Sequence, residues 1–102
     1  MKVKVKRTDG SREVVELDDR QHYEVTVEGN DGQGDHPDDG LYWRYDIVPA
    51  ANTREARKAV QEKIAASEEG RRQGEKVESV RALTHGEAAV MALNGYPELK
   101  VG

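Results

Sequence analysis

The sequence predicts an α+β domain. A four-stranded antiparallel β-meander packs against one long helix, followed by a fifth strand and a short C-terminal helix (order ββββαβα). Three observations predict this fold. Apolar and polar residues alternate with period two through much of the first 48 positions, and one long stretch with apolar residues at helical spacing follows. The length of 102 residues suits a single domain spanning residues 1–102.

The first two strands are predicted to form a hairpin, because alternating runs flank an Asp-Gly turn. A two-residue turn would place Val3 opposite Glu16. A three-residue loop with Gly10 in the left-handed conformation would place Val3 opposite Val15 instead. We favour the second register, because it separates apolar from charged residues on the two faces.

Residues 18–21 are predicted to form a turn, residues 23–28 a third strand and residues 41–48 a fourth. The fourth strand holds three of the five aromatic residues of the chain. Alternation divides it into one row with Leu41, Trp43, Tyr45 and Ile47 and a second row with Tyr42, Arg44 and Asp46. The more apolar row is expected to face the core, with Trp43 buried against Val25, Val60 and Ile64.

Residues 29–40 contain four Asp, several Gly and no large apolar side chain. Such a segment lacks anchors to a core, so we predict a mobile acidic loop between the third and fourth strands.

The long helix is predicted to begin at Asn52, with Glu55 placed to complete a capping box. Ala56, Val60 and Ile64 recur at every fourth position and would face the sheet. Gly70 or Gly74 is expected to end this helix.

The fifth strand is expected over residues 77–83, and a capping box at Thr84 opens the short helix. Residues 88–93 are apolar on every side, which is typical of a helix that is buried or docked on another molecule. We predict a homodimer through 88–93. The opposing possibility is a helix folded back beside residues 77–83. Residues 96–102 are expected to be a short tail.

Composition excludes several classes of protein. The chain has no Cys, which excludes disulfide scaffolds and thiolate chemistry. It has no secretory h-region and no apolar stretch of the ~20 residues needed to span a bilayer. A cytoplasmic protein without a membrane partner is therefore expected. Residues 1–51 carry 7 Lys and Arg against 12 Asp and Glu, whereas basic residues slightly exceed acidic ones in the second half. This acidic bias argues against nucleic acid and is compatible with a partner that has a basic surface.

No set of catalytic residues can be assembled, so the protein is predicted not to be an enzyme and to need no cofactor. Asp18, Asp19 and His22 resemble an acid–base group, but they lie at a turn with no nucleophile within reach in the sequence. The Asp-rich loop lacks the ligand ladder of an EF-hand, so no metal site is predicted. Cation binding by this loop is kept as an alternative.

A second alternative is binding of RNA or single-stranded DNA on an open sheet face that carries Lys2, Lys4, Lys6, Tyr42 and Arg44. Acidic residues alternate onto the same face, so nucleic acid is not the predicted partner.

We therefore predict a non-enzymatic protein-binding module. In size, charge and layout the chain resembles small acidic proteins of phages and mobile elements. That resemblance implies an inhibitor or adaptor that engages a basic surface. The predicted partner-binding residues come from the acidic loop, the aromatic strand and the short helix: Asp31, Asp35, Asp38, Asp39, Tyr42, Arg44, Val90 and Met91.

Overall fold

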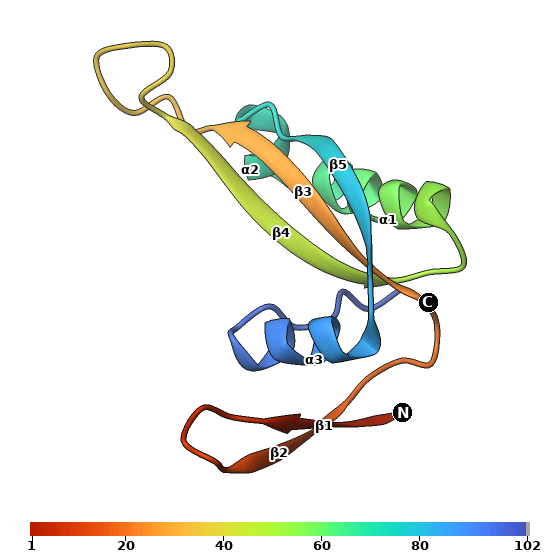
Figure 1. The fold of residues 1–102 in the computed structure, drawn as a ribbon. Helices are drawn as coiled ribbons and strands as arrows, with labels where there is room; N and C mark the ends of the chain where they lie inside the picture. Colours follow the sequence, from red (N-terminus) through yellow and green to blue (C-terminus); the bar gives the residue numbers. More distant parts are fainter. Residues whose placement is uncertain (102) are drawn as a thin grey trace.

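The computed structural model describes residues 1–101 and has an α+β fold with two antiparallel sheets and three helices (Figure 1). The predicted class and order of elements are confirmed, with one additional short helix, α2. In chain order the elements are β1 (Lys2–Lys6), β2 (Arg12–Glu16), β3 (His22–Asn30), β4 (Leu41–Pro49), α1 (Thr53–Ala66), α2 (Glu68–Arg72), β5 (Lys76–Leu83) and α3 (His85–Leu93).

The strands do not form one continuous meander. β1 and β2 make a separate hairpin, and the larger sheet has the order β4-β3-β5. β5 takes the place beside β3 that the meander would give to β2, and this pairing sets Val80 opposite Val25. The hairpin instead turns its apolar row toward α3, where Val3, Val5 and Val15 pack against a buried cluster that includes Leu17 and Ala88.

The favoured hairpin register is confirmed. Val3 lies opposite Val15 and Lys2 lies opposite Glu16. Gly10 has a φ of +87°, a conformation that a residue with a Cβ rarely adopts.

The core consists of two hydrophobic clusters. The first lies between the larger sheet and α1, and its buried members are Tyr23, Val25, Val27, Val48, Ala50, Ala56, Val60 and Ile64. The second joins the hairpin, α3 and one end of the sheet through Leu17, Ile47, Leu83, Ala88 and Ala89. Since Ile47 and Val48 enter different clusters, the end of β4 is buried on both faces.

The helices α1 and α3 begin at the predicted N-caps, but the predicted capping box at Asn52 is not completed, because the Glu55 carboxylate accepts from the Ala51 amide instead. Asn52 accepts a hydrogen bond from the Glu55 amide, and Thr84 with Glu87 forms a complete capping box. α1 ends earlier than predicted, at Ala66, because Ser67 adopts an extended conformation and caps α2. Gly74, with a φ of +61°, follows α2.

α3 lies between the hairpin and the larger sheet (Figure 1). Ala88 and Ala89 are buried there, and Met91 packs on the second cluster. The chain thus covers this apolar helix largely with its own hairpin, so the predicted dimer through 88–93 gains no support. No helix within residues 1–101 is long and apolar enough to cross a membrane.

The predicted burial of Trp43 is wrong. Trp43 is 52 % exposed, and Tyr42, Arg44 and Asp46 are the β4 residues on the side of α1 and α2. Alternation separated the two rows of β4 correctly, but it does not decide which row faces a helix. The polar row faces inward because α1, α2 and the segment before β5 supply charged and amide partners for it.

Candidate functional site

The candidate functional site is an open aromatic face on the larger sheet. We define the aromatic face by Leu41, Trp43 and Tyr45 of β4 and by Tyr96, which follows α3. Their exposed fractions are 37 %, 52 %, 40 % and 39 %, so all four large side chains meet solvent. Exposed apolar side chains that gather on one surface are more informative than scattered ones.

The two tyrosines hold each other in place. The rings of Tyr45 and Tyr96 make an edge-to-face contact, with centroids 6.1 Å apart and planes at 73°. The chain reaches this position through Gly95, whose φ is +95°, and the Tyr96 amide donates to the Met91 carbonyl at 3.0 Å. The face is therefore supported by α3 as well as by the sheet.

Paired charges border the aromatic face on the neighbouring strands. Glu24 is 3.4 Å from Arg81, and Glu28 is 3.6 Å from Lys76. The register places Trp43 opposite Glu28 and Tyr45 opposite Thr26. An apolar strip with a polar margin is the usual anatomy of a protein-binding surface.

Replacement of Trp43 by alanine is expected to lower the free energy of unfolding by less than about 1 kcal/mol, because an exposed ring leaves no cavity behind. Urea unfolding followed by circular dichroism measures this. The native emission spectrum of Trp43, the only tryptophan, should be that of an indole in contact with water. A loss of about 3–5 kcal/mol, as for a buried aromatic ring, would contradict the exposed placement.

Tyr42 and Arg44 belong to a polar network on the opposite face of β4. Arg44 binds the Glu75 carboxylate through Nε and Nη2, both at 3.1 Å, and also pairs with Asp46. Asp46 Oδ1 is 2.9 Å from Nζ of Lys63 on α1. Arg44 lowers the pKa of Glu75 by hydrogen bonding, against the opposing effect of burial. These side chains connect β4 with α1 and with the segment before β5, so they are engaged within the chain.

The Tyr42 ring lies across Gly29 on the neighbouring strand. A Cβ at Gly29 would be 2.4 Å from the Tyr42 oxygen, so only glycine leaves room for this ring. The hydroxyl is 2.6 Å from Oε1 of Gln73 and 2.6 Å from Oε2 of Glu75. Burial and the Glu75 carboxylate raise the pKa of Tyr42 to about 12.

Alkaline titration should therefore reveal Tyr42. The folded state holds Tyr42 protonated, so its contribution to stability is full below pH 10 and is lost as the pH rises from 10 toward about 12. Phenolate absorbance should show one of the four tyrosines titrating last. The late component should vanish in Tyr42→Phe and persist in Tyr96→Phe. A late component retained by Tyr42→Phe would assign it to another ring.

The acidic loop projects beyond the end of β3 and β4 (Figure 1), and all residues from 31 to 39 are exposed. Asp31 and Asp39 accept hydrogen bonds from backbone amides inside the loop. In the described part of the chain, no three His, Asp or Glu side chains come together as a metal site. Among the described residues, Asp35, Asp38 and their neighbours therefore do not form a set of ligands that could hold a cation. The mobility of the loop stays a prediction.

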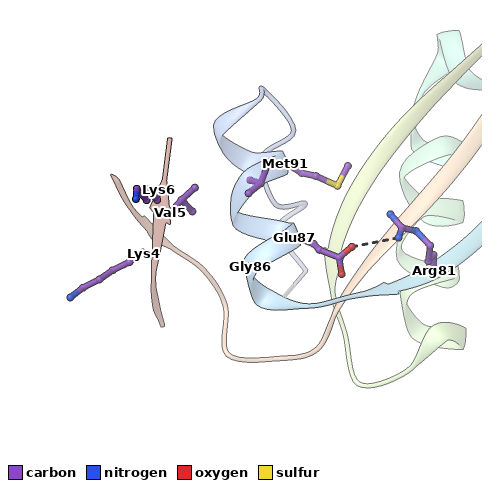
Figure 2. Close-up of a pocket in the computed structure, with 8 residues that line it drawn as sticks. Lys4, Val5, Lys6, Arg81, Gly86, Glu87 and Met91 are labelled. Atoms are coloured by element: carbon purple, nitrogen blue, oxygen red, sulfur yellow. Dashed lines mark ion pairs between the residues drawn. The ribbon is translucent and has the colours of Figure 1, made fainter. Parts of the chain in front are cut away.

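Val90 and Met91 line a groove between β1 and α3 (Figure 2). The groove has a volume of about 590 Å³ and also contacts Lys4, Val5 and Lys6 of the hairpin. The Arg81–Glu87 ion pair, at 3.6 Å, lies on the sheet side of the groove. The sequence placed the hairpin lysines and Arg44 on one open face. The structure separates them, because the hairpin is a sheet of its own.

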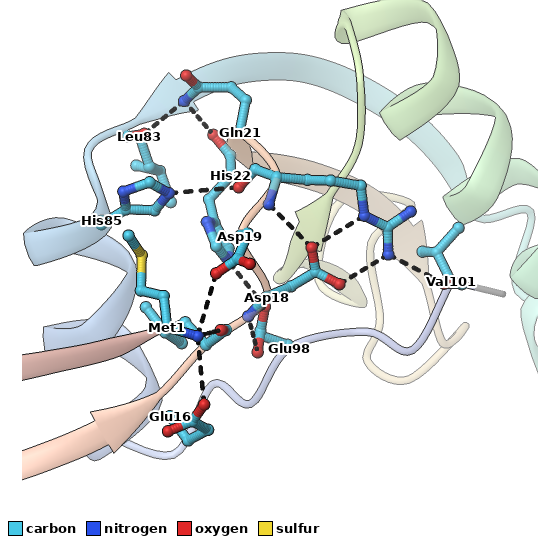
Figure 3. A network of polar contacts seen from close by, with 12 residues as sticks. Met1, Glu16, Asp18, Asp19, Gln21, His22, Leu83, His85, Glu98 and Val101 are labelled. Atoms are coloured by element: carbon cyan, nitrogen blue, oxygen red, sulfur yellow. Dashed lines mark hydrogen bonds and ion pairs between the residues drawn. The ribbon is translucent and has the colours of Figure 1, made fainter.

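His22, the first residue of β3, is fully buried in a polar network (Figure 3). Its Nε2 is 2.6 Å from Oε2 of Glu98, and the same carboxylate accepts from the Asp18 amide at 3.1 Å. The His85 ring packs edge-to-face on the His22 ring, with the ring centroids 5.2 Å apart. The second ring nitrogen of His22, Nδ1, has no hydrogen-bond partner among the described residues. These contacts attach Glu98 of the C-terminal segment to Asp18 and His22.

A second link ties the turn before β3 to the same segment. Arg20 forms a bidentate pair with Asp18, at 2.9 and 2.8 Å, and donates to the Val101 carbonyl at 3.1 Å. The guanidinium of Arg20 lowers the pKa of Asp18. The sequence suggested a group formed by Asp18 and His22, but it did not predict the contact with Glu98, which lies 76 residues from His22 along the chain.

Comparison with protein-family models, with curated proteins and with solved structures finds no match. Function therefore has to be inferred from the surfaces of this molecule.

Proposed function

We propose that the protein is a non-enzymatic protein-binding module whose recognition surface is the aromatic face. The observation that carries the proposal is the exposure of Trp43 and Tyr45 side by side on one strand, next to Leu41 and Tyr96. Both hydrophobic clusters are closed without Trp43, so the core does not require an indole at this position.

The residue types on the aromatic face support binding of another protein. Trp and Tyr are enriched among the residues that dominate binding energy, because they bury a large area with few rotatable bonds. Truncation of such a residue at the centre of an interface costs at least about 2 kcal/mol, which is roughly a 30-fold loss of affinity. Trp43 occupies the central position of the β4 row and should contribute most.

The acidic loop supports a basic partner. β3 and β4 stay paired up to Asn30 and Leu41, so the loop starts where the aromatic face ends. A partner that places an apolar side chain on Trp43 would bring its flanking residues close to the carboxylates of the loop. Basic residues at those flanks would be favoured, and they would raise the association rate at low ionic strength. This pattern fits a small acidic adaptor or inhibitor.

The placement of the polar side chains supports the non-enzymatic part of the proposal. The His22 side chain of the His22–Glu98 pair is fully buried, while the Glu98 side chain is 21 % exposed. The Ser11 hydroxyl donates to Asp9, and the Ser67 hydroxyl accepts from the Gly70 amide as a helix cap.

Stacking of single-stranded nucleic acid is the second candidate, because exposed aromatic rings on a sheet are the platform that RNA-binding sheets use. The flanks of this face argue against it. Glu24 and Glu28 balance the nearby cations, and the acidic loop would repel phosphate.

Affinity capture from a lysate of the source cells tests the proposal. The baits are the native chain, the double variant Trp43→Ala/Tyr45→Ala and, as a matched control, Val14→Ala. Val14 is 57 % exposed but lies on the hairpin, away from the aromatic face. We expect a protein that the native and Val14→Ala baits retain and the double variant loses. Retention by all three baits, or a captured species that nuclease rather than protease removes, would refute the proposal.

A further inference from the structure

The outer edge of β4 presents backbone groups without partners in the sheet. β4 is an edge strand, since the sheet order is β4-β3-β5. The Ile47 carbonyl accepts from the Leu99 amide at 2.7 Å, so it points away from β3. Alternate peptide groups of a strand point the same way. The N–H and C=O groups of Trp43 and Tyr45 therefore also point outward from the sheet, and no described residue outside the sheet pairs with them.

The free edge has defined ends. At one end, Leu99 and the bridge between Ile47 and Glu98 cover the strand. At the other end, the Leu41 amide donates to Asp38 within the loop at 3.2 Å. Between these ends, the outward groups without a partner in residues 1–101 are the Leu41 carbonyl and the N–H and C=O groups of Trp43 and Tyr45. α1 packs mainly over β5 and β3, so it does not overhang this edge (Figure 1).

The two edges of the sheet differ in how they are protected. β5 has a register irregularity opposite Thr26 and Val27 and carries exposed charges at Lys76 and Arg81. Bulges and charged side chains are the usual means of preventing strand addition at an edge. The aromatic row Leu41, Trp43 and Tyr45 contains no charged side chain. β4 also has no bulge, because it pairs with β3 without a register shift.

We propose that a second copy of this chain pairs with this edge, β4 against β4 in antiparallel orientation, with the two-fold axis at Trp43. The inference goes beyond the proposed function and does not depend on it. In this register Trp43 faces Trp43 of the second copy, and Leu41 faces Tyr45 of the second copy. Each outward residue then meets an outward residue, which is the geometry of hydrogen-bonded pairs in an antiparallel ladder. The Leu41 amide stays bonded to Asp38, so each Leu41–Tyr45 pair forms one bond, from the Tyr45 amide to the Leu41 carbonyl. Isologous pairing needs only one self-complementary surface.

Neighbouring registers are poorer. An axis at Arg44 would set two guanidinium groups opposite each other, which is unfavourable for like charges. It would also pair Leu41 of the second copy with Ile47, whose outward carbonyl already accepts a hydrogen bond from the Leu99 amide. An axis at Tyr42 would shorten the pairing and bring the two acidic loops together. The axis at Trp43 instead places Gly40 of the second copy opposite Asp46, so that each acidic loop starts near Lys63 of the other copy.

Such pairing would produce one continuous six-stranded sheet. The two aromatic rows would lie side by side on one face of it, because strands added in register keep their faces. The side chains of Trp43 and Tyr45 would remain accessible on that face. The dimer would thus present a doubled aromatic face, with an acidic loop at each end.

Sedimentation of the purified chain over a range of concentrations, at about 0.15 M salt to screen the net charge of −4, tests the proposal. We expect the mass to rise to twice that of the monomer. The double variant Leu41→Lys/Tyr45→Lys sets Lys against Lys in the predicted register and should remain monomeric. Leu41→Glu/Tyr45→Lys sets Glu against Lys and should dimerise again. A native chain that stays monomeric up to about 1 mM, or a Glu/Lys variant no better than the Lys/Lys variant, would overturn the proposal.

A second pair of variants separates the backbone pairing from side-chain binding. Trp43→Ala keeps the outward N–H, whereas Trp43→Pro removes it without touching the bonds to β3. The Pro variant should be monomeric and the Ala variant should still dimerise, provided that circular dichroism shows both folded. Equal dimerisation of both variants would overturn the edge pairing. Loss of the captured partner with both variants would leave the proposed function standing, so the two proposals fail separately.

Discussion

Replacement of Glu98 by alanine is expected to lower the free energy of unfolding by about 3 kcal/mol, since it removes the only hydrogen-bond partner of the buried His22 ring among residues 1–101. His22 has no exposed surface and its second ring nitrogen is already without a partner among residues 1–101. The same variant frees the Asp18 amide, which now donates to Glu98. For a domain of this size that loss is a large fraction of the total stability.

Urea unfolding of Glu98→Ala, Glu98→Gln and Lys100→Ala measures this effect. The glutamine variant keeps an acceptor for His22 and should recover part of the loss. Lys100 is exposed on the same segment, so its variant should change stability by no more than about 0.5 kcal/mol. Equal, small losses in all three variants would show that the C-terminal segment is not held by the His22–Glu98 contact.

Arg44→Ala is expected to cost about 2–4 kcal/mol, because it leaves two carboxylates without their shared cation. The side chains of Glu75 and Asp46 are only 9 % and 12 % exposed, so water cannot fully replace the guanidinium. Removal of both partners of the principal pair, in Arg44→Met/Glu75→Leu, should cost less than the sum of the single changes. Arg57→Ala, on the exposed side of α1, is the matched control. An additive double variant would exclude coupling between Arg44 and Glu75.

The same pair predicts how stability depends on acid. Arg44 lowers the pKa of Glu75 in the folded state. The contribution of the ionised Glu75 to the free energy of unfolding is therefore fully present above about pH 4.5 and is lost as the pH falls through the lowered folded-state pKa. Glu75→Gln should flatten this part of the stability curve. An unchanged acid limb in that variant would assign acid unfolding to other carboxylates.

Local signals in the sequence predicted local structure well. The Asp-Gly turn fixed the hairpin register through Gly10, and Asn52 and Thr84 marked the starts of α1 and α3, because caps and turns depend on residues a few positions apart. The period-two pattern of β4 also separated its rows correctly.

Long-range signals were missing from the sequence. The orientation of β4 depends on Gln73 and Glu75, which come after two helices and bind Tyr42 and Arg44 from the far side. The pairing of β5 with β3 likewise joins segments separated by α1 and α2. Apolar composition favoured a buried Trp43, whereas the pairing of polar groups decided which row faces inward. The exposed aromatic row, the feature on which the proposed function depends, could therefore be seen only in the fold.

The most direct test of the aromatic face is a photo-reactive benzophenone side chain placed at position 43, activated in a lysate of the source cells. We predict a covalent adduct with one protein, formed at position 43 and at position 45 but not at position 14 on the hairpin. The adduct should be sensitive to protease and not to nuclease. Cross-linking that is equally strong from position 14, or no adduct with another protein from position 43, would contradict the assignment of the aromatic face as the binding surface.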